Sequence, residues 1–154
     1  MNTTPARTDP VGERERAASA LRAAGYRVTS QRLVVHETLV ELGRHVGAEE
    51  LLAAVGERLP SVSLPTVYSS LEALEEAGLV RRVAAGRGRA LYDSRPVDHH
   101  HLVCRRCGAV EDLDAPVSLE RALESARRSG FEVDGAEVVV HGLCAACRRR
   151  ARRG

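Results

Sequence analysis

The sequence contains no tryptophan and no lysine, and it has few aromatic residues of any kind. Only 3% of its 154 residues are aromatic, and all 23 basic residues are arginine. No apolar run approaches the roughly 20 residues that a membrane-crossing helix needs, and a hydrophobic content of 44% is too high for a disordered chain. The first residues also lack the apolar core of a secretory signal. These absences predict a soluble, globular, cytoplasmic protein with no membrane partner.

The length and the charge balance limit the possibilities further. A chain of 154 residues has room for one ordinary domain or two small ones, since domains mostly run to about 100–150 residues. The 23 basic residues stand against 21 acidic ones, which gives a formal net charge of only +2. Bulk charge therefore does not indicate a nucleic-acid-binding protein, and evidence for DNA binding has to come from local patterns.

The first half of the chain predicts helices followed by a hairpin. Residues 1–12 show no periodicity and predict a flexible tail, whereas residues 13–93 predict one domain. Four apolar stripes at helical spacing are each ended by glycine or proline, and a strand pattern with a glycine turn covers residues 79–93. This is the plan of a winged helix-turn-helix domain, although a small α+β domain of another function has the same elements.

The fourth predicted helix is the candidate recognition helix. It opens with small and polar side chains that can reach phosphates and base edges, namely Ser63, Thr66, Tyr68, Ser69 and Ser70. Arginines that could hold the DNA backbone lie around the first two helices and in the hairpin, at Arg27, Arg32, Arg87 and Arg89. The sequence therefore predicts a DNA-binding surface on the N-terminal domain.

The second half predicts a separate, smaller domain. Residues 94–97 predict a hinge, because Pro96 stops a strand, and residues 98–147 follow as the second domain. The pattern predicts strands at 102–103, 109–113, 131–133 and 137–140, and a helix over 118–129. The predicted fold class is thus α+β, with an N-terminal winged helix and a small C-terminal α/β domain. The second domain has one phenylalanine as its only aromatic residue, so its core is small. A domain of this size usually needs a metal or another cross-link for stability.

Four cysteines form two C-x-x-C pairs, Cys104 with Cys107 and Cys144 with Cys147. Each pair can present two thiolates from a tight turn, and two such turns complete the tetrahedral sulfur shell that Zn²⁺ accepts. Four sulfurs leave no open position, so the zinc would be structural. Gly108 fits the positive φ of a metal knuckle. A redox pair, an iron–sulfur cluster and disulfides are the alternatives, and spacing and compartment favour them less.

Three adjacent histidines precede the first cysteine pair. On an extended strand His99 and His101 face the same side, so the β period supplies a pair of imidazole ligands. Asp93 ends the predicted hairpin and Asp112 lies on the following strand. Imidazole with carboxylate suits Fe²⁺, Mn²⁺, Zn²⁺ or Co²⁺. The pattern predicts a second metal site, with a solvated surface tract as the alternative.

Together these features resemble the Fur family of metal-dependent bacterial repressors, from about Gly25 to Cys147. The resemblance rests on Gly25-Tyr-Arg-Val-Thr-Ser-Gln-Arg32, His45-Val-Gly-Ala-Glu-Glu-Leu51, Ser63-Leu-Pro-Thr-Val-Tyr68 and His99-His-His-Leu-Val-Cys-Arg-Arg-Cys-Gly108. It implies a C-terminal dimerisation domain, a structural zinc on the four cysteines and a regulatory metal at the hinge, held by His45, Asp93, His99, His101 and Asp112. It further implies a homodimer on a palindromic, AT-rich, double-stranded DNA operator.

The regulatory residues also suggest a branch within the family. A set made only of histidine and aspartate is similar to the peroxide-sensing PerR branch, which includes FurA and CatR relatives. In that branch bound Fe²⁺ reacts with peroxide and oxidises a ligand histidine. The resemblance therefore implies Fe²⁺ or Mn²⁺ as the regulatory ion, with Zn²⁺ possible. An iron- or zinc-responsive uptake regulator stays open, because aspartate differs from glutamate by one methylene.

Some positions depart from the family pattern. Many members read Thr-Val-Tyr-Arg-Thr-Leu where this chain reads Thr66-Val-Tyr-Ser-Ser-Leu71, so the operator sequence does not transfer. An additional metal site of some members is incomplete, because Ala136 stands where those members have a histidine, although His100 could serve it. The arginine-rich residues 148–154 predict a solvated, disordered tail, with DNA contact as the alternative.

Two other classes of function remain as alternatives. A small metallohydrolase could use the histidine and aspartate residues to activate water, but the sequence offers no obvious general base or substrate cleft, so we expect no enzyme. A constitutive DNA-binding module that uses zinc only for folding would have the same cysteines. Metal-dependent operator binding distinguishes the repressor from both.

Overall fold

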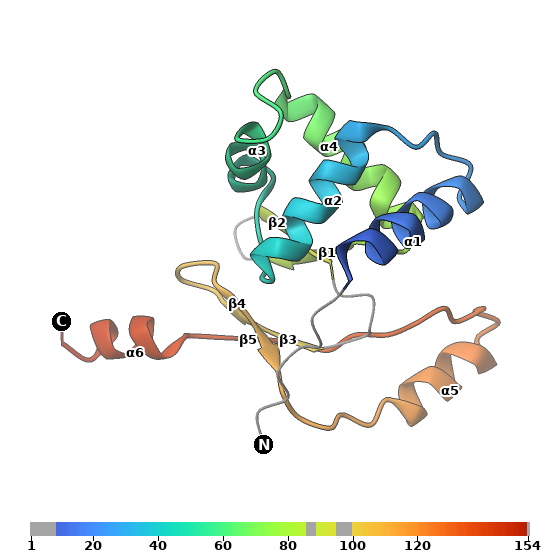
Figure 1. Cartoon of the computed structure of the whole chain (residues 1–154). Coiled ribbons are helices and arrows are strands. Elements are labelled where there is room, and N and C mark those ends of the chain that lie inside the picture. The colour runs from blue at the N-terminus through green and yellow to red at the C-terminus, as the bar shows by residue number, and fades with distance from the viewer. Residues whose placement is uncertain (1–8, 86–88, 95–99, 154) are drawn as a thin grey trace. The chain divides into compact units, whose positions relative to one another are not determined.

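The computed structural model describes residues 9–85, 89–94 and 100–153, and these residues separate into two compact units. The N-terminal unit holds described residues 9–83 and 90–94, and the C-terminal unit holds 84–85, 89 and 100–153. The mixture of helices and short sheets confirms the predicted α+β class (Figure 1). No helix among the described residues has the length and apolar character needed to cross a membrane.

The N-terminal unit consists mainly of four helices and a two-stranded sheet. They are α1 (Pro10–Ala23), α2 (Ser30–Leu42), α3 (Ala48–Gly56), α4 (Leu64–Glu76), β1 (Arg81–Ala85) and β2 (Arg89–Asp93). The apolar stripes of these helices meet in one core, in which Leu21, Leu39 and Leu74 are completely buried. Burial of each such leucine contributes roughly 1.5–3 kcal/mol, so these helices carry their own stability.

The first helix begins earlier than the sequence pattern indicates. Residues 1–12 were expected to form a tail, but α1 starts at Pro10, and the Asp9 carboxylate accepts a hydrogen bond from the Val11 amide at 3.3 Å. Aspartate at the N-cap followed by proline is a favoured helix start, because proline lacks the amide hydrogen that would stay unpaired there. The expected boundary at residue 12 is therefore wrong, while residues 1–8 lie outside the described part of the chain.

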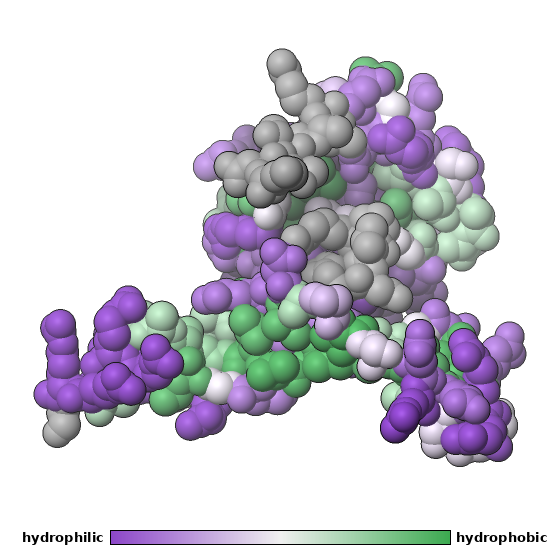
Figure 2. Space-filling model, turned by 90° about the horizontal axis from the view of Figure 1, so that it is seen from below, coloured by the Kyte–Doolittle hydropathy of each residue, from purple (hydrophilic) through white to green (hydrophobic). Residues whose placement is uncertain are grey.

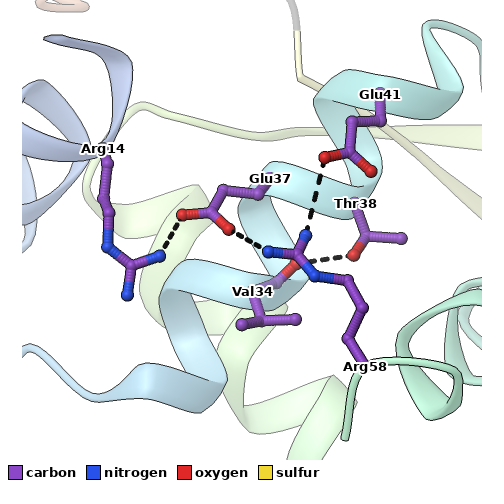
Figure 3. Close-up of polar contacts among 6 residues, drawn as sticks. All are labelled: Arg14, Val34, Glu37, Thr38, Glu41 and Arg58. Atoms are coloured by element: carbon purple, nitrogen blue, oxygen red, sulfur yellow. Dashed lines mark hydrogen bonds and ion pairs between the residues drawn. The ribbon is translucent and has the colours of Figure 1, made fainter. Parts of the chain in front are cut away.

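A chain of charged side chains connects three elements of this unit (Figure 3). Glu37 on α2 forms an ion pair with Arg14 on α1, and its other oxygen lies 2.6 Å from Arg58, which follows α3. Arg58 also reaches Glu41 at 3.6 Å. Because the Glu37 side chain is only 18% exposed, it links α1 and the end of α3 to α2 better than a fully solvated pair could.

The C-terminal unit is built on a three-stranded sheet in the order β4-β3-β5. Its elements are β3 (His100–Cys104), β4 (Val110–Leu113), α5 (Glu120–Arg128), β5 (Val139–Gly142) and α6 (Ala145–Ala151). β3 pairs with β4 antiparallel and with β5 parallel. The unit has little core of its own: Val103 is the one aliphatic residue buried among its described residues, and α5 has no buried residue at all.

Two sequence predictions for this unit are wrong. Residues 131–133 form no strand. The parallel pairing of β3 with β5 begins at His101 and Val139, so residues 131–133 have no partner strand among the described residues. Residues 148–151, expected to begin a disordered tail, belong to α6. The Cys144 sulfur caps that helix by accepting a hydrogen bond from the Cys147 amide at 3.5 Å, so the arginines continue an ordered turn.

Candidate metal centres and nucleic-acid interface

The four cysteines lie together because two strands run in the same direction. The parallel register places Cys104 opposite Gly142 at the carboxyl ends of β3 and β5, and each strand leads directly into a C-x-x-C turn. Gly108 closes the first turn with φ of 76°, as the sequence predicts. Two pairs that are far apart in sequence thus reach one edge of the sheet.

The cysteine geometry fits a zinc ion. The four sulfur atoms all lie within 4.8 Å of one another, and Cys107 Sγ is 3.8 Å from Cys144 Sγ. Tetrahedral zinc with Zn–S bonds of about 2.3 Å requires sulfurs about 3.8 Å apart. None of the four cysteines forms a disulfide. The cluster therefore fits a structural Zn²⁺, and it leaves no ligand position open for a substrate.

The electrostatics of the cluster favour a cation. The amide of Cys144 donates to Cys104 Sγ at 3.3 Å, and this bond, with the amides of Cys107 and Arg106, lowers the pKa of Cys104 to about 6. Cys104 is therefore a thiolate at neutral pH. Burial and the three neighbouring sulfurs raise the pKa of Cys147 to about 12. A bound cation would stabilise the remaining thiolates, since it supplies the opposite charge that the sulfurs lack.

In the N-terminal unit, a backbone bridge places His45 next to Asp93. Val46 and Tyr92 form an isolated antiparallel bridge, with amide-to-carbonyl distances of 3.1 Å and 2.8 Å. The bridge joins the loop before α3 to the end of β2 and sets His45 Nε2 3.5 Å from the Asp93 carboxylate. The two side chains are 6% and 1% exposed. A buried imidazole–carboxylate pair of this kind can supply two ligands to a divalent ion.

In the C-terminal unit, the sheet register places His101 opposite Asp112. The two residues are partners in the antiparallel pairing of β3 with β4, and partners in such a ladder project from the same face of the sheet. His101 is fully buried, and its Nδ1 lies 4.0 Å from the Glu137 carboxylate. Glu137 is a possible oxygen ligand that the sequence analysis missed, because no periodic or motif signal marks it. His99 lies outside the described residues.

His100 has a different role from its neighbours. Alternation along β3 places it on the face opposite His101, where its Nδ1 accepts a hydrogen bond from the Val138 amide at 3.1 Å. That bond fixes the chain just before β5. An imidazole whose Nδ1 accepts from the backbone keeps only Nε2 for any further contact. The hydrogen bond therefore connects the His100 side chain on β3 to the residue that precedes β5.

The candidate recognition helix α4 presents the expected polar face, with one correction. Ser63, Tyr68 and Ser69 are exposed, and Thr66 is partly exposed near the helix start. Ser70, by contrast, is 2% exposed, and its hydroxyl donates to the Thr66 carbonyl at 2.7 Å. Ser70 therefore packs against the core and cannot reach DNA. The helical period explains the error, because Ser70 lies on the same face as Val67 and Leu74.

The candidate backbone-binding arginines differ in how firmly they are held. Arg27 is exposed, whereas Arg32 donates to the Arg27 carbonyl at 2.6 Å and lies 5.2 Å from the centre of the Tyr26 ring. The stacked guanidinium is preorganised, and less side-chain entropy is lost when it binds an anion. Arg89 is exposed at the start of β2, and Arg87 lies outside the described residues.

The comparisons with known proteins agree with these features. A profile of the ferric uptake regulator family matches residues 23–141. The transcriptional regulator FurA of Mycobacterium tuberculosis is 43% identical over 131 residues, which cover 84% of this chain and 88% of that protein. The peroxide operon regulator of Bacillus subtilis is 30% identical over 138 residues, covering 90% and 95%.

A solved structure extends the similarity to the fold. A zinc uptake regulator complexed with zinc and DNA matches with a TM-score of 0.63 and 27% identity, covering 95% of this chain and 99% of that one. The sequence matches and this structural match include both units. The chain therefore belongs to the ferric uptake regulator family of metal-responsive transcriptional regulators, and it is a regulator rather than an enzyme.

Proposed function

We propose that this protein is a metal-dependent repressor whose regulatory ion takes ligands from both units. The observation that carries the proposal is that each unit contains its own histidine–carboxylate pair, His45 with Asp93 and His101 with Asp112. Hydrogen-bonded backbone brings the two residues of each pair together, since a bridge connects Val46 with Tyr92 and the strand register places His101 opposite Asp112. An ion held by both pairs and by His99 restricts the hinge at residues 94–97 and thereby the spacing of paired recognition helices.

Residues 13–93 read the operator in this proposal. The polar face of α4, from Ser63 to Ser69, enters the major groove, and Arg27, Arg32, Arg87 and Arg89 contact phosphates. The structural relative that is complexed with zinc and DNA supports double-stranded DNA as the partner. A twofold dimer requires a palindromic operator, and the family resemblance favours an AT-rich one. A protein that binds chromosomal operators acts in the compartment that holds the DNA, so the proposal includes a cytoplasmic location.

Residues 98–147 form the dimer in this proposal. The C-terminal unit exposes an apolar surface (Figure 2). Leu102 and Val140, on β3 and β5, line a pocket of about 320 Å³. Leu123 and Ala126 on α5, and Leu119 at its N-cap, are only partly buried. A second copy that covers this surface would supply the apolar burial that the unit lacks.

The ligand set supports the peroxide-sensing branch. None of the five proposed regulatory ligands is a thiol, and both carboxylates are aspartates. The name of one relative, the peroxide operon regulator, points to the same branch. Bound Fe²⁺ would supply the reaction with peroxide that oxidises a ligand histidine, whereas Mn²⁺ would support repression without that reaction. An iron- or zinc-responsive uptake regulator is the second candidate, and its ligands would be the same.

Operator titrations in the presence of Fe²⁺, Mn²⁺ and Zn²⁺ test the proposal. We expect His45→Ala to abolish metal-stimulated operator binding, because the ion then loses one of the two buried ligands in the N-terminal unit. The dimer should stay folded, and His141→Ala should behave as the unchanged protein, since His141 is exposed and outside the proposed site. Unchanged metal stimulation in His45→Ala would contradict the regulatory site.

A peroxide arm of the same experiment tests the branch. After treatment with peroxide, the iron-loaded protein should lose operator affinity, and mass spectrometry should find one added oxygen atom on a peptide containing His45 or His99. The manganese-loaded protein should keep its affinity. Equal resistance of both forms would favour an uptake regulator over a peroxide sensor.

A further inference from the structure

The cysteine cluster gathers arginines from two distant segments. Cys104-Arg-Arg-Cys107 carries Arg105 and Arg106, and the chain after Cys147 carries five more. The Arg105 amide donates to the Gly142 carbonyl at 2.9 Å, and Arg106 donates to the Cys147 carbonyl at 3.4 Å. The Arg105 amide therefore holds this turn against the end of β5, and the Arg106 guanidinium holds it against α6. We call this set the basic surface: Arg105, Arg106, Arg148, Arg149, Arg150, Arg152 and Arg153.

No aspartate or glutamate pairs with the basic surface in the part of the chain that the structure describes. All seven side chains are exposed, and none forms an ion pair with a residue in the described part of the chain. Residues 104–110 and 143–153 contain no aspartate or glutamate. This differs from α5, where Arg128 lies 3.3 Å from Glu124. A group of unpaired arginines on ordered backbone produces a local positive potential that the net charge of the chain does not reveal.

The geometry of α6 directs this charge outward. At about 100° per residue, the five arginines from 148 to 153 occupy an arc of about 200°, while Cys147 and Ala151 lie on the remaining side. Cys147 is 4% exposed and belongs to the cysteine cluster. One side of the helix is therefore anchored, and the other presents guanidinium groups to solvent. The Arg153 amide bonds to the Arg150 carbonyl at 3.3 Å and extends the turn past the helix end.

The chemistry of the surface favours duplex DNA over other polyanions. The side chains of α6 are only arginine, alanine and cysteine. It therefore lacks the large apolar side chains that anchor a helix in a bilayer interface and the aromatic rings on which single-stranded bases stack. A helix of seven residues is about 10 Å long. Phosphates of one DNA strand follow each other about every 3.4 Å along the axis, so three fit that length.

We propose that the basic surface around the cysteine cluster is a second DNA contact, which binds backbone phosphates without reading sequence. The inference rests on the proposed function as a DNA-binding regulator, and it adds a contact outside the winged helix. Because the surface holds no base-reading side chain in a groove, its contribution is equal for operator and random duplexes. Its effect is a higher affinity and a steeper dependence of that affinity on salt.

The test uses the full-length, metal-loaded protein and the triple variant R150Q/R152Q/R153Q, which leaves the cysteines and Arg148 intact. Binding to an operator duplex and to a random duplex of equal length is measured at several salt concentrations. We expect the slope of log affinity against log salt to become shallower by about 2.7 for each protomer whose basic surface contacts the duplex, because each phosphate that an arginine neutralises accounts for about 0.9 of that slope. Both duplexes should weaken by the same factor.

The matched control is R121Q/R127Q/R128Q, which removes the same charge from α5. Its slope should equal that of the unchanged protein, and equal zinc content and dimer mass in all three proteins exclude a folding effect. Equal slopes for the two triple variants would overturn the inference. A loss of binding to vesicles containing anionic lipid, without any change on DNA, would also overturn it. If the unchanged protein shows no preference for the operator, the proposed function fails, while the random duplex still decides this inference.

Discussion

His36 shows how a single buried residue can limit the stability of the N-terminal unit. The side chain is 3% exposed on α2, and its Nδ1 has no hydrogen-bond partner among the described residues. Burial lowers the pKa of His36 below 6.5, although Glu13 and Glu37 act in the opposite direction. The imidazole is therefore neutral in the folded protein at pH 7, and it is buried without the hydrogen bond that would offset its lost hydration.

We expect His36→Leu to raise the stability of the protein. Replacing an unsatisfied polar group by an apolar one of similar size should add about 1 kcal/mol at pH 7. Since the folded pKa is depressed, the unfolded chain binds more protons below about pH 6.5, and the stability of the unchanged protein falls as the pH drops from 7 to 5. The variant should lose less over that range. Thermal unfolding at several pH values measures both effects.

The control for this prediction is His141→Leu, because His141 is exposed on β5. It should leave the melting temperature at pH 7 unchanged. A variant at position 36 whose melting temperature falls as steeply with acid as that of the unchanged protein would show that His36 does not carry the pH dependence.

At the scale of elements, α2 is connected to its neighbours by charge as well as by packing. Glu37 holds both Arg14 and Arg58, whereas Glu41 is 68% exposed and contacts Arg58 alone. We expect Glu37→Gln to lower the free energy of unfolding by up to about 1 kcal/mol, which is the upper range for partly solvated pairs. Glu41→Gln should change it very little. Chemical denaturation in low salt measures the difference.

High salt provides an independent check of the Glu37 prediction. In about 1 M salt the screening length falls to about 3 Å, so the difference between Glu37→Gln and the unchanged protein should shrink. A difference that stays the same in high salt would mean that Glu37 acts through packing and not through its charge.

The sequence predicts some elements of this protein better than others. The apolar stripe of Val67, Leu71 and Leu74 predicted α4, because helical spacing is a local signal. The spacing within each C-x-x-C pair predicted the cysteine cluster, because two such pairs complete the four ligands of zinc. The strand at 131–133 was wrong because a strand exists only where a partner lies beside it, and the register of β3 is a tertiary property. Ser70 was misplaced because its residue type suggested a polar role that its position on α4 does not allow.

In the candidate site, too, local sequence signals indicate some features, and only the three-dimensional structure shows the others. Residue types and the β period indicated Asp93, His101 and Asp112 as candidate ligands, and the family resemblance added His45. The backbone bridge between Val46 and Tyr92 and the proximity of Glu137 to His101 appear only in three dimensions. The order of α6 was missed for a local reason. A run of arginines predicts repulsion and disorder, but a helix cap supplied by Cys144 outweighs that tendency.

At the scale of the whole molecule, the two units differ in what stabilises them. The N-terminal unit has a core of leucine and valine, whereas the C-terminal unit depends on its cysteines. We expect a strong chelator under reducing conditions to remove protection from hydrogen exchange in β3, β5 and α6, because metal binding at such a site supplies folding free energy. The helices α2 and α4 should keep their protection.

Hydrogen exchange followed by mass spectrometry measures this in one sample, and the intact mass confirms that the metal has left. Returning Zn²⁺ should restore protection in the C-terminal unit. Full protection of β3 and β5 in protein shown to be free of zinc would mean that the sheet is stable without its metal.

The parallel pairing of β3 with β5 also has a consequence for biosynthesis. Cys144 and Cys147 are translated after Cys104 and Cys107, with 36 residues between the two pairs. A nascent chain therefore exposes a two-thiol half-site that cannot close until the second pair has left the ribosome. The N-terminal helices, whose contacts are closer in sequence, can fold before that moment. The four-sulfur shell is thus completed after those helices can fold, and a chain truncated before residue 144 cannot complete it.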